Sequence, residues 1–63
     1  MTKKTLQQRE RDLQALLATE AGREELRDLV ASYQEAGGRV RPEGASVVTY
    51  ILVHEREHGL LAS

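Results

Sequence analysis

The sequence predicts a small all-α protein of three helices, covering about residues 5–18, 20–36 and 46–58, with the last helix the most buried. Two observations predict this fold: helix-capping residues precede all three segments and glycines follow the last two, and apolar residues recur within them at helical spacing. The chain has 63 residues and no cysteine, so we expect a single compact domain over 1–63 without disulfides, and a flexible N-terminus at 1–4. One core of this size supplies only ~3–5 kcal/mol of net stability, so self-association is a natural way to gain further burial.

The first helix is predicted from a capping box. The Thr5 hydroxyl can accept from a first-turn amide while the Gln8 side chain returns a bond to the Thr5 amide. Arg9 and Glu10 interrupt the apolar seam that follows, so this helix is expected to pack along one side only. The residues of that seam are Leu6, Leu13, Leu16 and Leu17.

The second helix is predicted to begin after Thr19, a good N-cap residue, and to end at Gly37-Gly38. One long helix from Thr5 to Ala36 is the alternative, but Thr19 and Gly22 weaken its middle, so we favour a break. The residues of the predicted seam are Gly22, Leu26, Leu29, Val30, Tyr33 and Ala36.

The connection over residues 39–45 contains Pro42 and Gly44, which disfavour a helix and permit a turn. Val40 is the residue expected to hold this connection against the core.

The third segment is ambiguous by propensity. Residues 47–53 are rich in β-branched side chains, so the alternative fold is a helix pair plus a strand at 47–53 that pairs in a dimer. The flanking residues favour a helix instead, because Ser46 is a good N-cap, Gly59 suits the C′ position, and Leu60 can make the apolar contact typical of such an end. Apolar side chains then point nearly all round the axis, which predicts a central helix buried between the others or in a homodimer.

The string His54-Glu55-x-x-His58 matches the helix signature of zinc proteases. Two histidines four residues apart share a helix face, and the glutamate of such a motif acts as general base. Only five residues follow His58, and none of them is a good zinc ligand. We therefore interpret His54 and His58 as weak metal-ligand candidates at the solvated end of a helix that also carries Glu55, and expect no catalytic residue, no enzyme and no cofactor.

The charge balance gives little support to nucleic-acid binding. Nine basic and ten acidic residues leave a net charge of −1, whereas nucleic-acid-binding domains usually carry a basic excess. Arg39 and Arg41 are candidate phosphate contacts, and Arg27 is expected to pair with acids such as Glu24. The longest apolar run, 47–53, is too short to cross a bilayer, and no secretory signal follows the N-terminus, so we expect a cytoplasmic protein without membrane contact.

These features favour a non-enzymatic helical protein that acts through protein–protein interaction, with itself as a homodimer or with a protein partner. A small nucleic-acid-binding regulator is the alternative, and a zinc-binding protein with the His54-Glu55-x-x-His58 motif comes third. The predicted interaction surface consists of Val47, Val48, Tyr50, Ile51, Leu52 and Val53.

Overall fold

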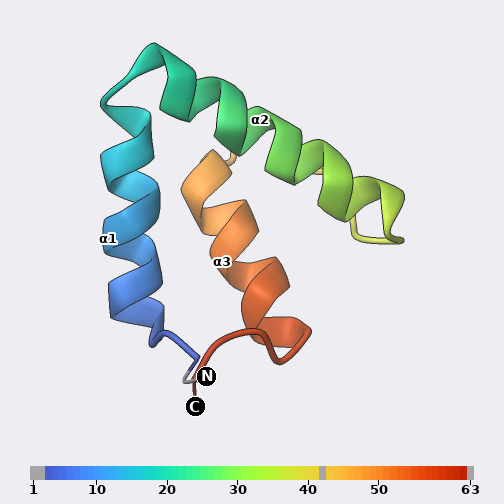
Figure 1. The fold of residues 1–63 in the computed structure, drawn as a ribbon. Helices are drawn as coiled ribbons and strands as arrows, with labels where there is room; N and C mark the ends of the chain where they lie inside the picture. Colours follow the sequence, from blue (N-terminus) through green and yellow to red (C-terminus); the bar gives the residue numbers. More distant parts are fainter. Residues whose placement is uncertain (1–2, 42, 63) are drawn as a thin grey trace.

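The computed structural model describes residues 3–41 and 43–62, and within them it contains three helices and no strand. They are α1 (Leu6–Leu17), α2 (Glu20–Glu35) and α3 (Val47–Glu57) (Figure 1). The predicted all-α fold is therefore confirmed, and the alternative with a strand at 47–53 is wrong. The predicted helices were longer by a residue or so at most ends because they included capping residues.

The capping chemistry explains where α1 and α2 begin. In α1, the Gln8 amide donates to the Thr5 hydroxyl over 3.2 Å, and the Thr5 amide donates to the Gln8 side-chain oxygen over 3.0 Å, which completes the capping box. The Thr19 hydroxyl accepts from the amide of Gly22 over 2.9 Å and starts α2. The chain therefore breaks between Leu17 and Glu20, as favoured from the sequence.

The glycines after α2 and α3 end both helices in the same way. The amides of Gly37 and Gly38 donate to Gln34 and Tyr33, and the corresponding amides after α3 donate to Arg56 and Glu55. Both pairs of bonds form a Schellman motif, whose C′ residue needs a positive φ. Gly37 at +92° and Gly59 at +68° supply that conformation without a Cβ clash.

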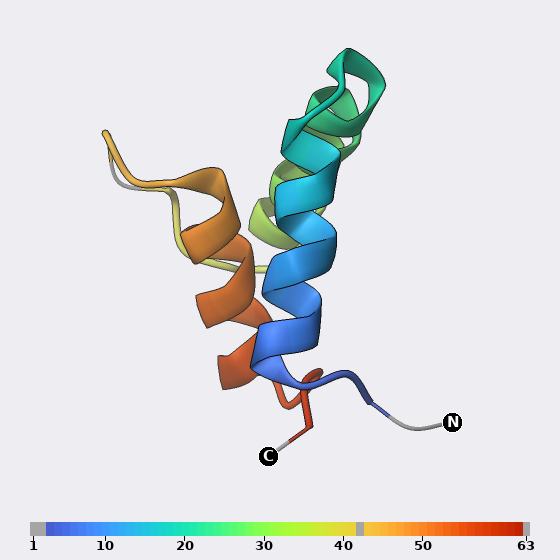
Figure 2. The ribbon, with the colours of Figure 1, turned by 90° about the vertical axis from the view of Figure 1, so that its left-hand side faces the viewer.

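The helices form one layered unit in which α1 and α3 lie side by side and antiparallel, while α2 crosses both (Figures 1 and 2). This course brings the two ends of the described chain together. The amide of Ala62 donates to the carbonyl of Lys4 over 2.8 Å, and the Lys3 ammonium donates to the carbonyl of Gly59 over 2.6 Å. Lys4 also pairs with Asp12 on the surface of α1. Met1 and Thr2 lie outside the described residues, so the flexible N-terminus stays a prediction.

The core is aliphatic apart from one tyrosine, and every helix contributes to it. Leu13, Leu26 and Ile51 are the largest fully buried side chains, one from each helix. The other buried apolar residues are Val30, Val48, Tyr50 and Leu52. Since four of these seven residues come from α3, that short helix carries much of the apolar contact.

Two apolar side chains do not behave as the sequence predicted. Val40 was expected to hold the connection against the core, but it is 80% exposed. The loop is attached instead through Tyr50, whose hydroxyl donates to the carbonyl of Arg39. Leu60, predicted to make an apolar contact at the end of α3, is 49% exposed. Pro42, predicted to shape this connection, lies outside the described residues.

None of the helices in the described part of the chain combines the length and the apolar character that crossing a bilayer requires.

Candidate functional site

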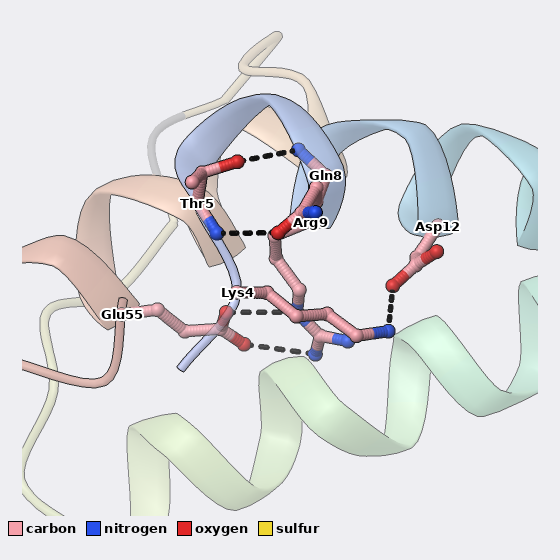
Figure 3. Close-up of polar contacts among 6 residues, drawn as sticks. All are labelled: Lys4, Thr5, Gln8, Arg9, Asp12 and Glu55. Atoms are coloured by element: carbon pink, nitrogen blue, oxygen red, sulfur yellow. Dashed lines mark hydrogen bonds and ion pairs between the residues drawn. The ribbon is translucent and has the colours of Figure 1, made fainter. Parts of the chain in front are cut away.

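A buried carboxylate at Glu55 connects all three helices. Glu55 is only 4% exposed and receives two hydrogen bonds from the Arg9 guanidinium, at 2.8 Å to Oε1 and 2.9 Å to Oε2 (Figure 3). The Tyr33 hydroxyl donates to Oε2 over 2.6 Å. Both carboxylate oxygens are therefore occupied by partners from α1 and α2, in the bidentate geometry that makes such pairs strong.

This arrangement overturns the expectation that Glu55 lies at a solvated helix end. The Arg9 guanidinium satisfies the buried charge, and the bond to Glu55 in turn raises the pKa of Arg9 against the opposing effect of burial. A general base in the zinc-protease motif would need a carboxylate free to accept a proton from a metal-bound water. The carboxylate of Glu55 is instead held by Arg9 and Tyr33.

The two histidines of the motif lie on a different side of α3, in a stack of rings with Tyr33. The ring centroids of Tyr33 and His54 are 4.0 Å apart with planes inclined by 11°, and those of His54 and His58 are 4.1 Å apart with planes inclined by 19°. Burial, and next the charge of neighbouring His58, lower the pKa of His54, while Glu55 and Glu57 oppose this shift. The neutral imidazole is therefore favoured at His54.

The histidine pair has no third metal ligand within residues 3–41 and 43–62. No group of three or more His, Asp or Glu side chains in that part of the chain is placed to hold one ion. Two imidazoles alone fall short of the three protein ligands that catalytic zinc sites use. The expectation of no cofactor stays a prediction.

A groove of about 400 Å³ lies beside this stack, between α3 and the connection that follows α2. Val53, Tyr50 and the two histidines line it from α3, and the segment 37–40 lines it from the opposite side. Both valines that line the groove are exposed, Val53 by 48% and Val40 by 80%. The groove is therefore apolar over much of its surface and carries charged groups of both signs, Arg39 and Glu57.

The predicted interaction surface divides between the core and this groove. Four of its residues are buried within the chain's own core, namely Val48, Tyr50, Ile51 and Leu52. Val47 is partly buried against that core, whereas Val53 is exposed. Of the exposed apolar positions around the groove, the sequence thus identified Val53 but missed Val40, which it assigned to the core.

The two candidate phosphate contacts, Arg39 and Arg41, lie at different sites. Arg39 lines the groove, whereas Arg41 lines a second hollow of about 260 Å³ beside the start of α3. Arg23 and Arg27 of α2 line the same second hollow. The predicted pairing of Arg27 with Glu24 is absent from the ion pairs of the described residues. Three arginines therefore surround one depression, which the sequence did not predict as a unit.

Arg9 and Tyr33 are the hydrogen-bond partners of Glu55, and the sequence did not predict either of them in that role. Arg9 lies four residues before the buried Leu13, and Glu55 lies four residues after the buried Ile51, so both occupy core-facing helical positions. One helix carries a positive residue on its core face and another helix carries a negative one. This is the sequence signal that could have predicted the pair. Spacing within either helix does not reveal which charge meets which, because the two residues are 46 positions apart.

Compared with known proteins, the chain matches no family model, no curated protein and no solved structure. Its function is therefore inferred from its own residues and their geometry.

Proposed function

We propose that this chain is a non-enzymatic interaction module that acts by self-association through the groove lined by 37–40 and α3. The observation that carries the proposal is the pair of exposed valines, Val40 and Val53, at an apolar groove of about 400 Å³. When a partner removes apolar side chains at a concave surface from water, the free energy of the system falls and the complex is stabilised.

A second copy of the chain is the occupant that this surface suits. A two-fold interface places the same patch against itself, so the patch must complement itself in shape and charge. Val40 supplies an apolar side chain that is 80% exposed at the same groove. Arg39 and Glu57 line the same groove, so a two-fold arrangement can pair each with its opposite charge on the other copy.

The enzyme alternative has less support. The engagement of Glu55 by Arg9 and Tyr33 leaves the motif without a free general base. Among the described residues, His54 and His58 also have no third side chain to complete a metal site. A binding role requires neither a free carboxylate at Glu55 nor a complete metal site.

The test measures the molar mass of the chain over a concentration series by sedimentation equilibrium. We expect a monomer–dimer equilibrium, and we expect Val53→Asp and Val40→Asp each to weaken dimerisation by at least about tenfold, because a charge would be buried at the interface. Leu6→Asp is the matched control, since Leu6 is 41% exposed on α1 and does not line the groove.

Two results would overturn the proposal. One is a monomer at every concentration in a wild-type chain that unfolds cooperatively. The other is an equal loss of dimer in Leu6→Asp, which would place the contact elsewhere. The three substituted side chains are exposed, so we expect each variant to keep the fold. Circular dichroism of each variant checks this.

A further inference from the structure

The second hollow, beside the start of α3, combines an apolar floor with a basic rim. Four apolar side chains, Leu17, Leu26, Val30 and Val47, line it together with three arginines. The arginines come from separate parts of the chain. Arg23 and Arg27 lie one turn apart on α2, and Arg41 comes from the connection before α3. The fold thus gathers three positive charges in a chain whose net charge is −1.

Two of these arginines donate to backbone carbonyls, and none of the three forms an ion pair with a carboxylate among the described residues. Arg23 donates one N–H to the carbonyl of Leu17 over 3.0 Å, and Arg41 donates one to the carbonyl of Ala45 over 2.6 Å. Such bonds orient a guanidinium and leave most of its five donors available. The ion pairs found in residues 3–41 and 43–62 are Lys4–Asp12 and Arg9–Glu55, and neither involves the hollow.

From this arrangement we infer that the hollow binds a compact anion bearing one phosphoryl group. A phosphate monoester carries about −1.5 to −2 charges at pH 7 and presents three acceptor oxygens. Guanidinium groups match those oxygens in planar, two-pronged hydrogen bonds. Val47, in the first turn of α3, also lines the hollow.

The size and charge of the site favour a small ligand over a polynucleotide. Nucleic-acid binding relies on many phosphate contacts spread along a basic surface. Here three arginines surround one hollow of about 260 Å³, and Arg39, the other candidate contact, faces the separate groove. The chain therefore offers one focused site rather than an extended basic track.

The experiment titrates the full chain with inorganic phosphate and follows backbone amide shifts by NMR. We expect saturable shifts confined to residues around the hollow and weaker binding as the salt concentration rises. Arg27→Gln and Arg41→Gln should each weaken binding by about tenfold, since each removes charge-assisted hydrogen bonds. Arg56→Gln is the matched control, because Arg56 is an exposed arginine that does not line the hollow.

The inference fails if phosphate produces no saturable shifts, or if Arg56→Gln weakens binding as much as the other two substitutions. A single-stranded oligonucleotide serves as the second probe. If the oligonucleotide binds, and Arg39→Gln, Arg41→Gln and Arg56→Gln weaken it equally, contacts spread over the surface replace the compact site. Amide shifts of each unliganded variant establish that the fold is intact.

Discussion

At the scale of single residues, Gly22 determines how closely α2 can approach the end of α1. A Cβ at this position would lie 2.0 Å from the carbonyl oxygen of Leu16 and 2.8 Å from its Cα. Both are backbone atoms, so relief of the clash requires one helix to move. The sequence suggested that Gly22 weakens a continuous helix, but its more specific role is to allow this contact.

We predict that Gly22→Ala lowers the free energy of unfolding by at least about 2 kcal/mol. The overlap outweighs the ~1 kcal/mol that alanine gains over glycine in helix propensity. Urea denaturation followed by circular dichroism measures the change. Gly37→Ala is the control, since a Cβ there meets no atom within 4 Å and only the positive φ of +92° opposes it, at about 1–2 kcal/mol. A Gly22→Ala variant as stable as wild type would contradict the predicted contact.

At the scale of helices, the element boundaries were predictable because the interactions that set them are local. Thr5, Thr19 and Ser46 each cap an amide three residues onward, and glycines follow α2 and α3. Such short-range interactions can be predicted from the sequence.

The pairing of Arg9 with Glu55 could not be predicted from the sequence, since it depends on how α1 and α3 pack. That pairing also changed the interpretation of the zinc-protease motif, because its glutamate is buried and bonded to Arg9 and Tyr33 instead of lying at a solvated helix end.

We predict that the Arg9–Glu55 pair stabilises the packing of α1 on α3, and that its two halves are not equivalent. Arg9→Met leaves a carboxylate that is 5% exposed without its charge partner, at a cost of about 3 kcal/mol. Glu55→Gln leaves a guanidinium that is 26% exposed and can reach water, at a cost of about 1–2 kcal/mol. Denaturant unfolding of the two single variants and of the double variant measures both costs and their coupling.

The control for this cycle is the exposed pair Lys4–Asp12, whose side chains are 58% and 41% exposed. Lys4→Met should change the unfolding free energy far less than Arg9→Met does, because exposed pairs contribute little. Additive effects of Arg9→Met and Glu55→Gln would show that the two side chains do not stabilise each other. A loss of stability in Glu55→Gln also means that a loss of any activity in that variant is not evidence for a catalytic base.

At the scale of the whole molecule, Tyr33 connects the buried Arg9–Glu55 pair to the groove. Its hydroxyl donates to Glu55, its ring stacks on His54, and His54 lines the groove. The groove itself was only partly predictable, because one of its walls is the connection 37–40, which no helical periodicity describes. Tyr33 was placed on the correct helix face from its spacing, but its hydroxyl partner came from the packing of α2 on α3.

This position makes the stability of the fold sensitive to alkaline pH. Burial, and next the hydrogen bond to Glu55, raise the pKa of Tyr33 from 10.0 to about 12. The folded state therefore holds this proton more tightly than the unfolded state does. The resulting stabilisation is fully present below pH 10 and is lost as the pH rises through about 12, where ionised Tyr33 would face the carboxylate of Glu55.

We predict that Tyr33→Phe is less stable than wild type at neutral pH by about 1.5–3 kcal/mol, because the buried Glu55 loses a hydrogen bond. The difference should shrink as the pH rises from 10.0 towards 12, since the unfolded wild type then releases the tyrosine proton while the folded state has to keep it to hold the bond. Urea unfolding at a series of pH values measures both free energies, and the ultraviolet absorbance of tyrosinate in the folded protein reports the ionisation directly. A difference that stays constant over this range would mean that the Tyr33 proton does not contribute to holding the three helices together.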